Sequence, residues 1–477
     1  MSEKQTNTTK CPYIKKCSGC QLSNLDYPAQ LSFKQTRVIK LMGKFCHIDE
    51  IKGMDLPYHY RNKMQAAFFK KNGKTLSGVY QSTTGRITET ESCLIEDELS
   101  NEITLACRKL FDSFKMKPYN EETKSGFIRH LLIRRGFATN EIMVVIVTAD
   151  GKFPSSRSFV NALVKKFPEI KTIVWNINDT ELFLSLGKKS EILYGDGYIE
   201  DILCGLKFRI SPHSFYQINP VQTEYLYNKA KEFAELKPTD TVIDAYCGTG
   251  TIGLIMAKGA GKVIGVEVNS SAVNDAIKNA ELNSITNESF YCDDAGKFMA
   301  SLAEKGEKAD VVITDPPRAG CSREFLQSLV KLSPRKIVYI SCNPETLARD
   351  MQYLLHKGYR AEKIQPVDMF PHTRHIETVV LLSKLKSTHH IEVELKTDEL
   401  DLTSAESKAT YDEIKAYVKE HTGLTISSLN IAQVKQKCGI IERENYNKAK
   451  SKNSRQPKCP KEKEEAIVEA MKFFKMI

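Results

Sequence analysis

From about Thr239 onward, apolar residues fall into short strand-length runs separated by longer amphipathic segments. In those longer segments the apolar positions recur three and four residues apart, which indicates helices. Strands are expected at 242–244, 263–266, 289–291, 311–314, 337–340, 361–366 and 378–382, and helices at 251–258, 271–283, 297–304, 322–332 and 344–356. Strands alternating with helices in this way predict a mostly parallel, doubly wound α/β sheet.

The other parts of the chain are less regular. Residues 1–95 form a cysteine-rich segment that we expect to pack with a central mixed α+β region at 96–205. The α/β unit covers 206–384, and the mostly polar stretch 385–408 is expected to be a linker. A small basic helical domain is expected at 409–477, with helices at 410–421, 427–438 and 462–475.

Composition and charge narrow the class of protein. The 477 residues contain 41% hydrophobic and 27% charged residues, as in ordinary globular proteins. There is no apolar run of membrane-spanning length and no secretory signal, so we expect a cytoplasmic protein without a membrane partner. The 13 cysteines are then expected to be reduced rather than a disulfide framework. A net charge of +10 suits a nucleic-acid partner, although on its own it is weak evidence.

A nucleotide-type cofactor site is predicted where the expected parallel strands end. The glycine-rich turn that begins at Asp244 follows the first of them and opens a helix. Acidic residues end the next three strands, at Glu267, Asp294 and Asp315, and such strand ends meet at one edge of a sheet. The glycine spacing also fits a dinucleotide site for NAD. The acidic residue before the turn and Asp315-Pro-Pro-Arg favour S-adenosylmethionine instead.

Cys342 stands at the end of the following expected strand. Asn343-Pro344 begins a helix directly after it, and a helix N-terminus favours a thiolate, so we expect a lowered pKa and a reactive thiol. The alternative is that Cys342 is one more buried small residue.

Five motifs resemble those of one enzyme family. They are Ser214-Phe-Tyr-Gln-Ile-Asn-Pro, Asp244-Ala-Tyr-Cys-Gly-Thr-Gly, Asp315-Pro-Pro-Arg-Ala-Gly, Ser341-Cys-Asn-Pro and His375-Ile-Glu-Thr. From Cys11 to about Lys384 the chain resembles the RNA uracil-5-methyltransferases, which make 5-methyluridine in 23S ribosomal RNA and transfer RNA. The resemblance implies the seven-stranded class I fold of S-adenosylmethionine-dependent methyltransferases.

The resemblance also implies roles for individual residues. Cys342 would be the nucleophile that adds to uracil carbon 6, and Glu377 the base that removes the carbon-5 proton. His372 and His375 are competitors for the role of base. Phe215 would pack in the target-base pocket. The cofactor would be held by Gln217, Tyr246, Thr251, Glu267, Asp294 and Asp315.

The N-terminal cysteines are similar to the ligand set of the ribosomal branch of the family. Cys11, Cys17, Cys20 and Cys93 would hold a [4Fe–4S] cluster, for which four thiolates are suitable; zinc is the alternative on spacing alone.

The substrate expected from this resemblance is RNA, most of all 23S ribosomal RNA, bound by a monomer with the target base extruded or already in a loop. Transfer RNA is the first alternative. A methyltransferase acting on a nucleobase nitrogen or a small molecule, a non-catalytic RNA-binding ribosome-assembly factor, and NAD-dependent chemistry are the other hypotheses.

Overall fold

The computed structural model describes residues 11–81, 86–180, 186–385, 411–438 and 459–473. The chain divides into two compact units, Met1–Lys386 and Ser387–Ile477. Within the described residues, no helix is long and apolar enough to cross a membrane.

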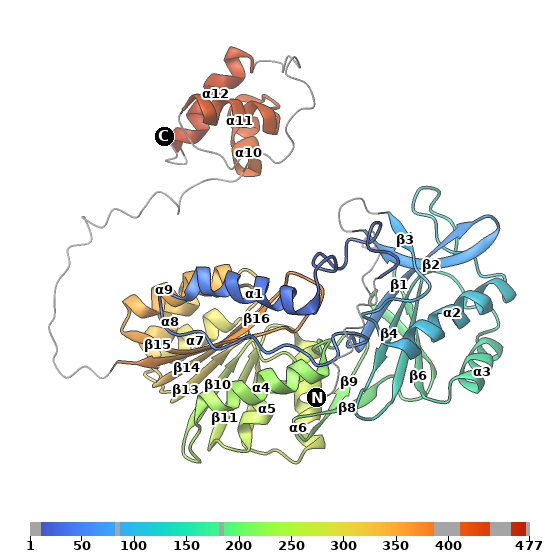
Figure 1. Ribbon diagram of the computed structural model, residues 1–477, viewed down its shortest axis with the longest axis horizontal. Helices are drawn as coiled ribbons and strands as arrows, with labels where there is room; N and C mark the ends of the chain where they lie inside the picture. The colour runs from blue at the N-terminus through green and yellow to red at the C-terminus, as the bar shows by residue number, and fades with distance from the viewer. Residues whose placement is uncertain (1–10, 82–85, 181–185, 386–410, 439–458, 474–477) are drawn as a thin grey trace, which may run out of the picture. The chain divides into compact units, whose positions relative to one another are not determined.

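The expected doubly wound sheet is confirmed in the first unit. Its strands lie in the order β12-β11-β10-β13-β14-β16-β15 (Figure 1). Their bounds are β10 (Thr241–Ala245), β11 (Lys262–Glu267), β12 (Glu288–Cys292), β13 (Val311–Thr314), β14 (Lys336–Ser341), β15 (Tyr359–Val367) and β16 (Glu377–Lys384). The first five strands of that order are parallel, and β16 runs antiparallel between β14 and β15. This is the class I methyltransferase sheet.

Helices cover both faces of this sheet (Figure 1). On one face lie α4 (Pro220–Ala234), α5 (Thr251–Ala257) and α6 (Ser270–Leu282); on the other lie α1 (Tyr27–Met42), α7 (Ala295–Glu304), α8 (Arg323–Leu332) and α9 (Pro344–His356). Helix α1 was not expected from the sequence. Its buried face consists of Gln30, Lys34, Val38 and Met42, so half of the positions that should be apolar are polar.

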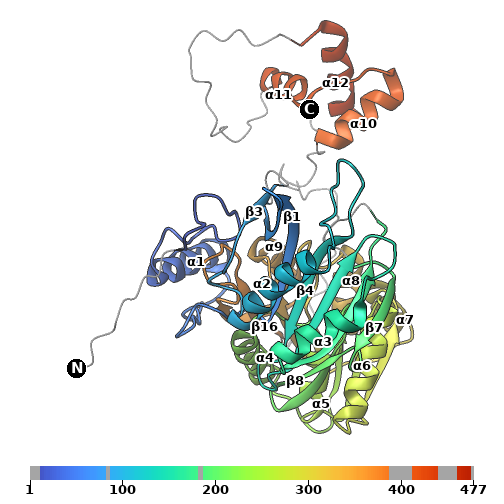
Figure 2. The same cartoon turned by 90° about the vertical axis from the view of Figure 1, so that its right-hand side faces the viewer.

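A second seven-stranded sheet has the order β3-β2-β1-β4-β5-β6-β7. Its strands are β1 (Lys63–Lys71), β2 (Lys74–Tyr80), β3 (Ile87–Glu89), β4 (Ile128–Arg135), β5 (Ile142–Thr148), β6 (Ile170–Ile177) and β7 (Lys189–Tyr194). Helices α2 (Glu98–Ser113) and α3 (Ser156–Lys166) cover one face (Figure 2). Strands from both sides of residue 95, where we placed a boundary, therefore share one sheet.

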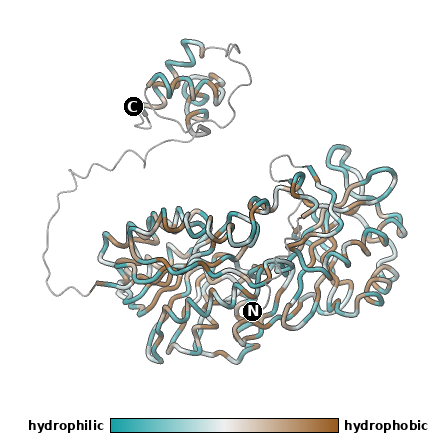
Figure 3. The backbone as a smooth tube through the Cα atoms, in the orientation of Figure 1, coloured by the Kyte–Doolittle hydropathy of each residue, from teal (hydrophilic) through white to brown (hydrophobic). Residues whose placement is uncertain are grey.

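The two sheets are joined by a common apolar core. Its members come from β4 and β5, from the hairpin of β8 (Ile199–Leu203) and β9 (Leu206–Ile210), and from α4, α5 and the methyltransferase strands. Apolar positions are concentrated in the strands of both sheets (Figure 3). This shared core explains why residues on both sides of the expected boundary at 205 belong to one compact unit.

A buried ion pair fastens α1 to the segment that leads into β16. Lys34 and Asp368 are both fully buried, and their side chains form an ion pair. Lys34 Nζ also donates to the Phe370 carbonyl at 3.1 Å, and the Tyr27 hydroxyl donates to the second Asp368 oxygen at 2.8 Å. The charges are thus compensated without water, which is the condition for burying them.

The second unit contains the three helices expected from the sequence. They are α10 (Tyr411–Thr422), α11 (Ser428–Lys437) and α12 (Lys461–Phe473), and they pack around a small apolar core that includes Ile414, Ile431 and Ile467. The expected linker lies outside the described residues apart from Leu385.

We predict that Lys34→Met lowers the free energy of unfolding of the first unit by about 3–5 kcal/mol, because it leaves the Asp368 carboxylate buried without its counter-charge. Urea unfolding followed by the fluorescence of Trp175, the one tryptophan of the chain, reports on this unit. Arg37→Met is the matched control, since its ion pair with Glu345 is partly exposed and worth at most about 1 kcal/mol. Equal losses in the two variants would contradict the prediction.

Candidate active site

The sheet brings Cys342 and Glu377 next to one another. Cys342 follows β14, and Glu377 is the first residue of β16. These strands are antiparallel, and Ser341 lies opposite Thr378. One residue forward from Ser341 and one residue back from Thr378, the same register places Cys342 opposite Glu377. Asp315 follows β13, the parallel neighbour of β14, so its carboxylate reaches the same edge.

The loop after β13 carries Arg318 to the thiol. The Arg318 side chain lies close enough to Cys342 to lower the pKa of its thiol. Its own carbonyl accepts from Asn343 Nδ2 at 3.0 Å, and this fixes the loop against the start of α9. Asn343 also caps that helix by accepting from Glu345 N–H. The expected helix start after Cys342 is thus confirmed. Arg318 belongs to the Asp315-Pro-Pro-Arg motif, but its approach to Cys342 was not predicted. Its position three residues after Asp315, in the loop that follows β13, was the signal that could have indicated it.

The pKa of the Cys342 thiol differs from the expectation. Burial, and then the charges of Glu377 and Asp315, raise this pKa to about 11, while Arg318 opposes the shift. The predicted lowering is therefore wrong for the protein without ligands. A helix N-terminus favours the thiolate, but the two acids beside the thiol and the loss of water outweigh it.

The surroundings of Glu377 also favour its neutral form. Its side chain is buried, with 3% of the residue exposed. Burial raises its pKa well above the ordinary value; the charge of Asp315 adds to the shift and Arg318 opposes it. Burial likewise raises the pKa of Asp315 to about 7. A buried carboxyl beside a thiol is the arrangement expected of a proton-transfer group.

The two competing histidines have different surroundings. His372 Nε2 lies 2.9 Å from the Pro57 carbonyl, and its Nδ1 lies 3.2 Å from the Gln30 amide. Both ring nitrogens are thereby engaged with the N-terminal segment. The pKa of His375 is lowered, first by burial and then by nearby cations, Arg318 among them.

The glycine-rich turn has the geometry that its sequence requires. Gly248 and Gly250 have φ of 55° and 79°, in the left-handed region that favours glycine. Glu267 accepts from Gly248 N–H at 3.2 Å. The Asp244 carboxylate accepts from Gly253 N–H at 2.7 Å, and burial together with the charges of Asp315 and Glu267 raises its pKa to about 7. Asp244, Glu267 and Asp315 therefore converge at this edge of the sheet.

The remaining predicted cofactor residues surround this turn. Tyr246, with φ of 65°, lies close enough to Asp294 that the charge of Asp294 raises the tyrosine pKa, after burial and Cys321. The Asp294 carboxylate also caps α7 by accepting from Lys297 N–H. Gln217 and Thr251 both hydrogen-bond the hydroxyl of Tyr227, a buried residue of α4.

Tyr227 was missed by the sequence analysis. It stands on one helix, while its two partners come from the segment before that helix and from the start of α5. No local pattern reveals such a meeting, which depends on how α4 packs on the sheet.

The four N-terminal cysteines lie near one another. After burial, the charges of Cys17 and Cys11 raise the pKa of Cys20, and the charge of Cys20 contributes to the raised pKa of Cys93. In the part of the chain that the structure describes, however, no group of three or more histidine, cysteine or acidic side chains could hold a metal ion. Within the described residues the structure therefore does not support the expected metal site, whether for a [4Fe–4S] cluster or for zinc.

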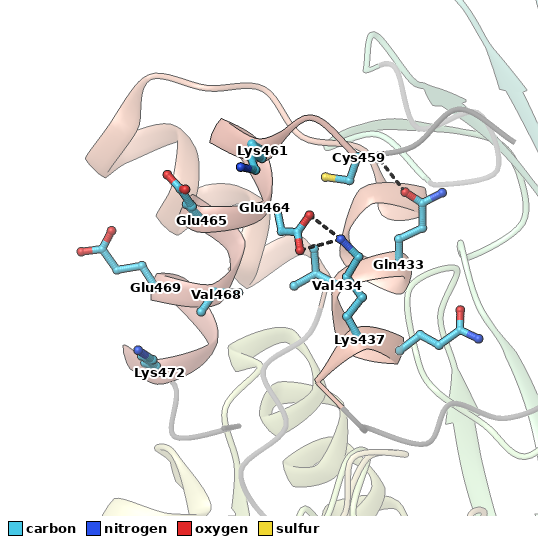
Figure 4. Close-up of a pocket in the computed structure, with 11 residues that line it drawn as sticks. Gln433, Val434, Lys437, Cys459, Lys461, Glu464, Glu465, Val468, Glu469 and Lys472 are labelled. Carbon is cyan, nitrogen blue, oxygen red and sulfur yellow. Dashed lines mark hydrogen bonds and ion pairs between the residues drawn. The ribbon is translucent and has the colours of Figure 1, made fainter.

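A large pocket lies away from all these residues in the sequence. It has a volume of about 890 Å³, belongs to the second unit and lies beside α11 and α12 (Figure 4). Lys437 and Glu464 form an ion pair of 2.6 Å within it. The lining holds lysines and glutamates in equal number (Figure 4), namely Lys437, Lys461, Lys472, Glu464, Glu465 and Glu469, so its charges balance.

Comparisons with known proteins indicate the family of this chain. Residues 181–385 match the family model described as tRNA (Uracil-5-)-methyltransferase. An uncharacterised RNA methyltransferase of Oceanobacillus iheyensis is 43% identical over 373 residues, which are 77% of this chain and 81% of that protein. One of Staphylococcus aureus is 43% identical over 379 residues, 78% of this chain and 83% of that protein.

A solved structure is also similar. It is the Pyrococcus abyssi tRNA (uracil-54, C5)-methyltransferase in complex with S-adenosyl-L-homocysteine, with 29% identity and a TM-score of 0.66, covering 77% of this chain and 86% of that one. With this fold, this site and these relatives, the chain belongs to the RNA uracil-5-methyltransferase family.

Proposed function

We propose that this protein transfers the methyl group of S-adenosylmethionine to carbon 5 of a uracil in RNA, with Cys342 as nucleophile and Glu377 as base. The observation that carries the proposal is the placement of a thiol opposite a buried carboxyl, at the strand ends that border the glycine-rich turn. Nitrogen methylation, NAD chemistry and a purely structural role would not need this pair.

The order of steps follows from the chemistry of uracil. Carbon 5 is too weak a nucleophile to take a methyl group unaided. Addition of the Cys342 thiolate to carbon 6 moves the electron pair of the ring double bond to carbon 5 and the adjoining carbonyl, forming an enolate. S-adenosylmethionine, when bound, would supply the methyl group to carbon 5 and leave as S-adenosylhomocysteine. Glu377 removes the proton from carbon 5, the double bond re-forms and the thiolate leaves.

The pKa values of the free protein have a consequence for this sequence of steps. Burial raises the pKa of both Cys342 and Glu377, so the thiol must lose its proton when the substrate binds, and Glu377 must be ionised when it acts as the base. Arg318 is the cation that favours the thiolate. We propose that it activates the nucleophile by this electrostatic contact.

We propose Gln217, Tyr246, Thr251, Glu267, Asp294 and Asp315 as the residues that hold the cofactor. The convergence of the acids at one strand edge and the exposed N–H groups of the turn support this assignment. The Pyrococcus abyssi neighbour, which binds S-adenosyl-L-homocysteine, supports the choice of cofactor.

The first test traps the covalent step. With RNA containing 5-fluorouridine, we expect the wild-type protein to form an adduct stable to denaturing electrophoresis, because fluorine cannot be removed as a cation. Cys342→Ala should form none. Glu377→Gln should form an adduct with ordinary uridine RNA and release it about 10²–10⁴-fold more slowly.

A control separates chemistry from folding in this experiment. All three proteins should show the same thermal shift on addition of S-adenosylmethionine. An adduct with Cys342→Ala, or its absence from the wild type in the presence of the true substrate, would refute the proposed mechanism.

The role of Arg318 is tested through thiol reactivity. Loss of the cation should raise the pKa of Cys342 and reduce the thiolate fraction at pH 8. We therefore predict that Arg318→Gln slows carboxamidomethylation of Cys342 by iodoacetamide roughly three- to tenfold, measured by mass spectrometry of its peptide. Cys292, which is exposed, is the internal control and should react at an unchanged rate. An unchanged rate at Cys342 would remove Arg318 from the mechanism.

We further propose that the four N-terminal cysteines bind a [4Fe–4S] cluster. Their mutual proximity supports the proposal, and a cluster needs its four thiolates further apart than a single ion does. Anaerobically purified protein should contain about four iron and four sulphide per chain, and Cys20→Ser should lose most of both. One equivalent of zinc and no sulphide would show a different site.

For the substrate we propose 23S ribosomal RNA, on the resemblance of the cysteines to those of the ribosomal branch. Transfer RNA is the second candidate, since the family model and the Pyrococcus abyssi neighbour are both named for it. Mass spectrometry of 5-methyluridine in separated ribosomal and transfer RNA, with and without the gene, distinguishes them.

A further inference from the structure

Two cations face each other at one end of the second sheet. Lys63, the first residue of β1, and Arg134 of β4 are direct partners in the antiparallel register. Directly opposed residues point to the same face of a sheet, and like charges in that position destabilise it. Arg61 lies close enough to Lys63 that its charge, after burial and Arg134, helps to lower the pKa of Lys63 to about 8.

These cations are poorly neutralised. Within the described residues, Lys63 Nζ has neither a hydrogen bond nor an ion pair, although the side chain is only partly exposed. Arg134 is 5% exposed and donates to the Ser214 and Pro212 carbonyls, while its buried Nε has no partner. The acid that acts on Arg134 is Asp275.

Asp275 cannot fully compensate for this charge. One of its oxygens accepts hydrogen bonds from both Ser211 Oγ at 3.0 Å and Ser214 Oγ at 2.7 Å. Lys63, Arg61 and Arg134 form a cluster of cations whose nearby acid, Asp275, already accepts hydrogen bonds from two serines. Such a cluster lowers the stability of the fold. Such an arrangement is typical of a site whose missing partner is an anionic ligand.

The cluster contacts the segment that carries Phe215 and Gln217, two residues predicted at the active site. Asn62, between Arg61 and Lys63, donates from its side chain to the Gln217 carbonyl at 2.9 Å and from its backbone to the Ile218 carbonyl. Arg134 holds the Ser214 carbonyl from the other side. The segment between these contacts contains Phe215, which is 67% exposed.

An exposed aromatic ring beside cations is the combination that binds single-stranded nucleic acid, since bases stack on the ring and phosphates meet the cations. We propose that Lys63, with Arg61 and Arg134, binds a backbone phosphate of the substrate RNA beside the target uracil. That the bound nucleotide adjoins the target base rests on the proposed role of Cys342; the binding of phosphate does not.

The test measures RNA binding by Lys63→Gln. Fluorescently labelled single-stranded oligouridine and oligoadenosine are titrated with the full-length protein over a series of salt concentrations. We expect affinity to fall about three- to tenfold at low salt, equally for both oligomers, and the slope of log K against log salt to decrease by about one. Lys63→Arg should restore most of the affinity.

Lys171→Gln is the matched control, because this exposed lysine lies on β6 of the same sheet, and it should bind as the wild type does. Removal of one of two opposed charges should leave the melting temperature of Lys63→Gln unchanged or higher. A lower melting temperature with an unchanged salt slope would show a structural lysine and overturn the proposal. So would a loss of affinity confined to oligouridine, which would indicate a base contact.

The outcome is independent of the proposed chemistry. Trapping with 5-fluorouridine RNA fails if Cys342 is not the nucleophile, whereas the salt slope of Lys63→Gln depends only on phosphate binding. Wild-type protein that forms no adduct but loses one unit of salt slope on Lys63→Gln would refute the mechanism and support the phosphate site.

Discussion

The buried contact between Lys34 and Asp368 is the interaction on which the geometry of the first unit depends. It joins a helix near the N-terminus to the segment between the last two strands of the methyltransferase sheet. Hydrogen bonds between Gln30 and His372 continue the attachment along that segment. Glu377 begins the strand that follows, so its position is set by residues more than three hundred positions away in the sequence. This attachment adds to the pairing of β16 with β14, which places Glu377 opposite Cys342.

At the active site, burial and the charges of neighbouring acids both raise the pKa values of the thiol and the carboxyls, and Arg318 opposes them. The sheet places Asp315, Cys342 and Glu377 at one edge, and this crowding of acids with little water raises the pKa of the thiol and of both carboxyls. A neutral thiol reacts slowly with oxidants and alkylating agents. The site is therefore chemically quiet until a bound substrate changes its surroundings, and cations near the site are the groups positioned to shift that balance.

The α/β sheet could be predicted from the sequence because apolar residues recur at regular spacings in its strands and helices. The strand-end acids could be predicted too, since the ends of parallel strands must meet. Helix α1 was missed because Gln30 and Lys34 occupy its buried face. The direction of the Cys342 pKa shift was wrong because the helix start is visible locally, whereas the approach of Glu377 is not. Lys63 opposite Arg134 likewise depends on strand register, which the pattern of β1 does not reveal.

The attachment of α1 has a consequence for synthesis on the ribosome. This helix leaves the exit tunnel before the acid that neutralises Lys34, which is translated more than three hundred residues later. Until then its lysine must stay hydrated, and the helix cannot take its final place. The second sheet lies between the two in the sequence and can form earlier from its own strands. The active site is therefore completed only when nearly the whole first unit has emerged, which protects the nascent chain from premature chemistry.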